Sequence, residues 1–69
     1  MSNYTAIYRD VFNFHKSRAA CLVNDESFFR ETLREMTEIS IKYNADPFVS
    51  ELLLVVYGEL ERRANEQQV

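Results

Sequence analysis

The sequence contains very few of the residues that interrupt or cross-link a folded chain. Its 69 residues include one glycine, one proline and one cysteine. So few turn-forming residues argue against a β-sandwich, a disordered chain or a loop-rich secreted scaffold. The single cysteine excludes an internal disulfide, and the single histidine excludes a His-rich metal cage. A chain this short buries a limited core, so association with a second chain is the stabiliser that remains open.

Long apolar runs and positive charge are also scarce. The longest apolar run, Leu52 to Tyr57, has six residues, far fewer than the roughly 18 that span a bilayer. Polar residues stand at the N-terminus where a signal peptide would be apolar, so we expect a cytoplasmic protein without a membrane segment. Eight Lys and Arg stand against eleven Asp and Glu, a net charge of −3, which argues against broad binding to nucleic-acid phosphates.

Apolar residues recur at helical spacing in the first two segments. The first segment predicts a helix over about 4–22, capped by Ser2 or Asn3. The second predicts a helix over about 26–43, with Glu26 placed to pair with Arg30 and Glu38 with Lys42, each acid four residues before its base. Asn44 suits the left-handed conformation that ends a helix.

The third segment has the clearest helix start in the chain. Asp46 is suited to the N-cap position and Pro47 to the first helical position, where the missing N–H costs nothing. We predict a helix over about 47–65, followed by a polar tail at 66–69. A strand at Leu52–Tyr57 is the competing interpretation, which we reject because no second strand exists to pair with it.

These segments predict an all-α fold, a single helical domain over residues 1–69. The expected arrangement is a three-helix up-down-up bundle with short connections. We expect its centre to contain the apolar residues that recur most regularly: Ile7, Tyr8, Val11, Phe29, Leu33, Met36, Leu52, Val56 and Leu60.

The third helix carries more apolar surface than one core can use. Its apolar residues cover roughly 200° of the circumference, against the little over 100° that a small bundle requires, and Leu54 points away even from that stripe. Gly58 is unfavourable in a helix interior unless it allows a close helix–helix approach. We therefore expect a non-enzymatic protein–protein interaction module, most simply a homodimer. The expected interface residues are Leu53, Leu54, Tyr57, Gly58 and Glu61.

A small DNA-associated regulator is the alternative hypothesis. Dimerisation would bring together two copies of the basic first helix, with Arg9, Lys16 and Arg18 as the candidate nucleic-acid contacts. The second and third helices are acidic, which argues against a helix-turn-helix arrangement. The aromatic ladder of Tyr4, Tyr8 and Phe12 could stack bases, although core packing explains it more simply.

No group of residues assembles a catalytic or metal site, so we expect no enzyme activity, cofactor or bound metal. His15 is expected at the edge of the core, and Cys21 as a small buried residue near a helix C-terminus. Three glutamates share a predicted helix face, and the bases interleaved with them indicate a salt-bridged surface. These glutamates are Glu31, Glu35 and Glu38.

Several short runs resemble small uncharacterised proteins of Gram-positive bacteria and their phages or mobile elements. The runs are Lys42-Tyr43-Asn44, Asp46-Pro47-Phe48, Leu52-Leu53 and Glu59-Leu60-Glu61-Arg62, behind an N-terminal Tyr-x-x-x-x-x-Phe segment. The resemblance implies an all-helical fold and a mobile-element or accessory gene product. It implies no catalytic residue.

Overall fold

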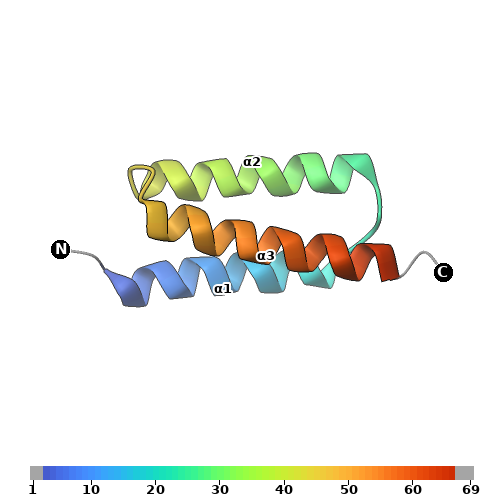
Figure 1. Cartoon of the computed structure of the whole chain (residues 1–69), viewed down its shortest axis with the longest axis horizontal. Helices are drawn as coiled ribbons and strands as arrows, with labels where there is room; N and C mark the ends of the chain where they lie inside the picture. The colour runs from blue at the N-terminus through green and yellow to red at the C-terminus, as the bar shows by residue number, and fades with distance from the viewer. Residues whose placement is uncertain (1–2, 67–69) are drawn as a thin grey trace.

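The computed structural model describes residues 3–66, which form three helices. They are α1 (Tyr4–Ala20), α2 (Glu26–Lys42) and α3 (Pro47–Glu66). In Figure 1, α1 and α3 run in the same direction and α2 runs against them. Each helix contacts the other two, which confirms the predicted all-α bundle in up-down-up order. None of these helices is long and apolar enough to cross a membrane.

The helix ends lie close to the predicted positions. Asn3 caps α1 by accepting a hydrogen bond from the backbone of Ala6, 3.1 Å from N to Oδ1. Helix α1 ends at Ala20 rather than near 22, and α2 ends one residue before the predicted position. Helix α3 includes Glu66, which was expected to open the polar tail. The rest of that tail, like the alternative cap Ser2, lies outside the described residues.

The turn between α2 and α3 uses two consecutive residues in the left-handed conformation. Asn44 has φ 57°, as predicted, and Ala45 has φ 56°, which the sequence did not suggest. An alanine in this region costs about 1 kcal/mol. The Ala45 amide compensates by donating to the carbonyl of Ser40 at 2.8 Å. Asp46 then accepts from the backbone N of Phe48 at 2.8 Å and caps α3 as expected.

The buried core differs in its members from the predicted one, because each helix buries only the stripe that faces the other two helices. Five of the nine predicted core residues are buried: Ile7, Val11, Met36, Val56 and Leu60. The prediction was wrong for Tyr8 and Leu33, which are 56% and 47% exposed. Phe29 and Leu52 are half-buried. The interior is completed by residues that the prediction left out: Phe14, Phe28, Val49, Leu53 and Ala64.

One polar side chain lies fully inside the bundle. Thr32 on α2 has no exposed surface, and its hydroxyl donates to the carbonyl of Phe28 one turn earlier at 2.8 Å. Because the hydroxyl is satisfied within its own helix, its burial needs no polar partner on α1 or α3.

Candidate functional site

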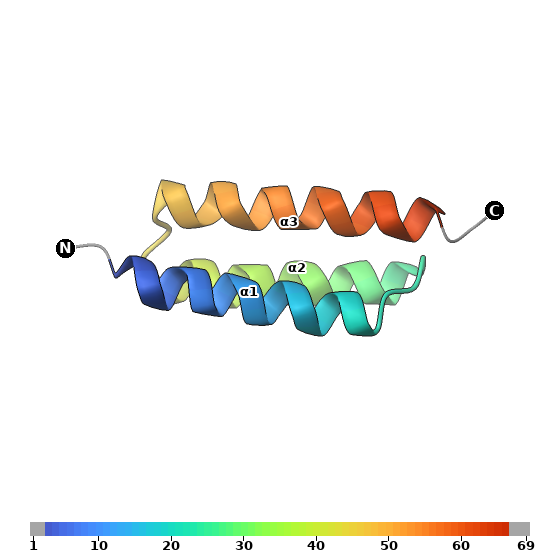
Figure 2. The same ribbon diagram turned by 90° about the horizontal axis from the view of Figure 1, so that it is seen from below.

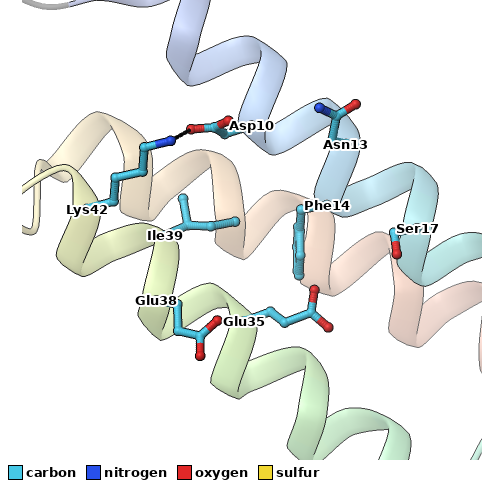
Figure 3. A pocket seen from close by; sticks show the side chains of 8 residues that line it. All are labelled: Asp10, Asn13, Phe14, Ser17, Glu35, Glu38, Ile39 and Lys42. Carbon is cyan, nitrogen blue, oxygen red and sulfur yellow. Dashed lines mark hydrogen bonds and ion pairs between the residues drawn. The ribbon is translucent and has the colours of Figure 1, made fainter.

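The groove between α1 and α2 contains charged side chains that pair with oppositely charged neighbours. Figure 3 shows Asp10 of α1 reaching Lys42 of α2. The Lys42 ammonium donates to Asp10 at 2.7 Å and the Tyr43 hydroxyl donates to the same oxygen at 2.5 Å. These hydrogen bonds, Lys42 first, lower the pKa of Asp10, and the bond to Asp10 raises the pKa of Tyr43. The cluster therefore ties α1 to the end of α2.

Arg18 makes a second link between α1 and α2. Its guanidinium lies 2.8 Å from the carboxylate of Glu35, and the Arg18 side chain is only 11% exposed. The guanidinium also lies 4.7 Å from the centre of the Phe28 ring, a favourable cation–π geometry. The Nε atom of Arg18 has no hydrogen-bond partner. Arg18 is thus a structural residue, and the prediction that it contacts DNA is not compatible with its burial in the bundle.

The three glutamates of α2 do not form one cluster. Glu31 and Glu38 both pair with Arg34, at 2.7 and 2.8 Å, whereas Glu35 turns toward α1. The expected Glu26–Arg30 pair is present at 2.8 Å. The expected Glu38–Lys42 pair is wrong, because Lys42 reaches Asp10 instead. The interpretation of Glu31 and Glu38 as a salt-bridged surface is confirmed.

His15 and Cys21 lie in different surroundings. His15 is half-buried in the groove between α1 and α3, where Glu59 and Arg63 also lie. Cys21 is exposed, contrary to the expectation of burial, because α1 ends before it. Its thiol donates to the carbonyl of Ser17 at 3.4 Å and accepts from Arg18 at 3.2 Å. The two side chains therefore do not combine into a nucleophile–base pair.

The predicted interface residues divide between the core and the surface. Leu53 is 2% exposed and belongs to the core rather than to the outer surface of α3. Tyr57 is half-buried and packs edge-to-face on Phe29 with ring centroids 5.8 Å apart. Burial, and secondly the negative charge of Glu61, raise the pKa of Tyr57. Of the five residues, Leu54, Gly58 and Glu61 remain exposed.

Val55 extends this exposed surface and was missing from the predicted interface. It is 71% exposed and Leu54 beside it is 62% exposed. The sequence pattern counted Val55 within the broad apolar stripe of α3. The sequence alone does not show that Val55 lies on the exposed side of α3, because that depends on where α1 and α2 pack against this helix. We call Leu54, Val55 and Gly58 with the flanking Glu51 and Glu61 the outer face of α3.

An apolar groove lies beside this face. Between α2 and α3, a cavity of about 240 Å³ has Met36 and Leu53 among its lining residues, together with the partly exposed Leu33 and Leu54. Small polar side chains complete the wall: Thr37, Ser40 and Ser50. The lining of the groove suits an apolar side chain. It includes no charged group that would orient a small polar substrate.

The aromatic ladder of α1 packs on the start of α3. The rings of Tyr4 and Tyr8 lie edge-to-face on Phe48, at 5.7 and 5.9 Å between centroids. All three ladder residues nevertheless keep more than half of their surface exposed, 62% for Phe12. Core packing therefore accounts for only part of the ladder.

No protein-family model, curated protein or solved structure matches the chain. The resemblance to small helical proteins of Gram-positive bacteria and phages accordingly stays a prediction.

Proposed function

We propose that this chain is a non-enzymatic protein–protein interaction module that forms a homodimer through the outer face of α3. The observation that carries the proposal is the surroundings of Gly58. A side-chain carbon added at this position would meet nothing within 4 Å. Glycine in a helix interior costs about 1 kcal/mol relative to alanine, and no close contact inside the described bundle requires it.

The neighbours of Gly58 support the same conclusion. Leu54 lies one turn before it, and Val55 lies beside Leu54 on the same outer side of α3; both are more than 60% exposed. On the surface of α3, Gly58 is bordered by Leu54 and Val55 on its N-terminal side and by the charged Glu61 and Arg62 on its C-terminal side. A backbone position without a side chain next to apolar side chains lets a second helix approach closely. The face is also continuous with the apolar groove between α2 and α3, because Leu54 belongs to both.

The chemistry of the other surfaces favours an interaction module over an enzyme. The carboxylates in the α1–α2 groove are each held by a base: Asp10 by Lys42, Glu35 by Arg18 and Glu38 by Arg34. A general acid or base works best when its pKa lies near the operating pH. The hydrogen bonds to Asp10 lower its pKa and so move it further from neutral pH.

Light scattering on the wild type and on Leu54→Glu tests the proposal. The wild type should have about twice the 8.2 kDa mass of one chain at micromolar concentration. Leu54→Glu should be a folded monomer, because the new carboxylate would lose its hydration in the interface.

Ile41→Glu is the matched control for this experiment. Ile41 is 70% exposed on α2, so the substitution adds the same charge and removes an equally exposed apolar side chain away from α3. It should stay dimeric, and circular dichroism should show the same helix content in all three proteins. A monomeric wild type, or a Leu54→Glu protein that still dimerises, contradicts the proposal.

A further inference from the structure

One narrow stripe of α3 lies on the side that points away from the other two helices. In Figure 2, α1 and α2 both lie on one side of α3. Counting about 100° per residue places four exposed residues opposite the buried ones: Glu51, Val55, Gly58 and Arg62. Their spacings of four, three and four residues are those of positions that face a partner helix in a coiled coil. We call these four residues the seam of α3.

The two ends of the seam carry opposite charges that the bundle leaves available. Glu51 forms no ion pair with any described residue of its own chain. Arg62 pairs with Glu59, but Arg63 binds the same carboxylate at 2.7 Å, so one acid serves two bases. The Arg62 side chain is 65% exposed. Arg62 can therefore bind a further carboxylate while Arg63 holds Glu59.

The seam is complementary to itself when one copy is reversed. A two-fold axis perpendicular to α3, level with the midpoint between residues 56 and 57, lays two copies of the helix antiparallel. Position 51 then lies opposite position 62 of the second copy, and position 55 lies opposite position 58. Glu51 of each copy meets Arg62 of the other, and Val55 of each copy covers the open space at Gly58 of the other. The symmetry makes each contact twice.

A parallel arrangement of the same seam lacks this complementarity. Each residue would then face its own copy, so Glu51 would meet Glu51 and Arg62 would meet Arg62. Like charges that face each other oppose association. The two glycines would also lie opposite each other, and no side chain would fill the space between them. Charge and shape both favour the antiparallel arrangement.

We infer that the outer face of α3 binds the same face of a second copy in antiparallel orientation, with Val55 over Gly58 and Glu51 paired with Arg62. This inference rests on the proposed homodimer and specifies its orientation and register. Leu54 lies beside the seam on the side of α2, where it borders the glycine of the second copy. The apolar contacts favour association, and the charges select the orientation.

Charge reversal tests the pairing. Glu51→Lys and Arg62→Glu each place like charges at both symmetric contacts, so each should weaken the dimerisation constant by about tenfold. The double variant should recover the dimerisation constant of the wild type, because the opposite charges are then exchanged. In a parallel dimer, Glu51→Lys would only replace one like-charge pair by another and leave the constant unchanged. Analytical ultracentrifugation over a range of concentrations compares the four proteins.

Glu61→Lys is the matched control for the Glu51 reversal. Glu61 is exposed on the same helix and lies off the seam, so the same charge change should leave dimerisation at least as strong as in the wild type. Circular dichroism should show equal helix content in all variants. Single variants that dimerise like the wild type, or a double variant that dimerises no better than they do, would overturn the inference.

Disulfide cross-linking measures the orientation directly. The background is Cys21→Ser, which removes the exposed native thiol, and the two variants carry Glu51→Cys or Arg62→Cys. In the antiparallel dimer, the new thiols of two identical chains lie about 16 Å apart along α3, too far for a disulfide. An equimolar mixture brings unlike thiols together. The oxidant diamide should therefore cross-link the mixture and neither variant alone, as seen on a non-reducing gel.

The outcomes separate this inference from the proposed function. If Leu54→Glu is monomeric while Glu51→Cys cross-links to itself, the homodimer through α3 stands and its antiparallel orientation is wrong. If the wild type is monomeric, both fail together.

Discussion

At the residue scale, a few side chains between helices determine how the bundle is joined. Asp10 is the clearest case, because it accepts from both Lys42 and Tyr43. Its own side chain is 23% exposed, whereas Lys42 is 61% exposed. The Asp10–Lys42 ion pair therefore remains partly screened by water. Its contribution to the free energy of unfolding is best detected by changing the pH.

The acid stability of the fold should depend on Asp10. Its pKa is lower in the folded protein than the ordinary 3.8, with the Lys42 hydrogen bond as the largest cause. The stabilisation is therefore present above the unfolded pKa and is lost as the pH falls through the folded value. The difference in free energy of unfolding between wild type and Asp10→Asn should shrink from about pH 5 downward. Denaturant unfolding at several pH values measures it, and an equal difference at pH 7 and pH 2 would contradict the assignment.

At the element scale, α3 combines two different surfaces on one helix. Its inner side supplies five buried residues: Val49, Leu53, Val56, Leu60 and Ala64. Its outer side exposes Leu54 and Val55. The apolar run at 52–57 is thus shared between the core and the surface, which explains why it resembles a continuous apolar segment in the sequence.

The Gly58→Ala substitution distinguishes an effect on the stability of the bundle from an effect on dimerisation. Because the added methyl group meets nothing within 4 Å, the substitution should raise the free energy of unfolding of the monomer by roughly 1 kcal/mol. This is best measured by denaturant unfolding in the Leu54→Glu background, where both proteins are monomers. In the wild-type background the same methyl group should weaken dimerisation. A destabilised monomer would show that the bundle itself requires glycine at this position.

At the scale of the whole molecule, the small core leaves little tolerance for lost packing. Each helix contributes one thin stripe, and eight of the buried side chains form a single apolar cluster. A chain of this size has a small margin of stability. Dimerisation would add stability through mass action.

Two isoleucine truncations test how sharply stability depends on position. Ile7 is 2% exposed and Ile41 is 70% exposed. Ile7→Ala should cost about 2–5 kcal/mol through lost burial and the cavity left behind. Ile41→Ala should change stability by about 0.5 kcal/mol or less. Thermal or denaturant unfolding compares them, and similar losses at both positions would contradict the described core.

Part of the candidate site could be predicted from the sequence. Leu54 and Gly58 were identified because each departs from the local pattern of α3: a leucine outside the apolar stripe and a glycine in a helix interior. Arg18 was misassigned because a basic residue on a helix looks free until the opposite helix supplies Glu35. Leu53 was misassigned because residues on one broad stripe are indistinguishable until the neighbouring helices show which part is covered.

The sequence by itself determined the helices, since spacing, caps and turn residues act over a few positions along the chain. Asn3 and Asp46 bond to amides two or three residues away, so no distant residue is needed to place them. The tertiary structure decided which side of each helix is buried and which charges are paired. Those properties depend on residues from different helices, such as Asp10 and Lys42, whose meeting is set by the packing of the whole bundle.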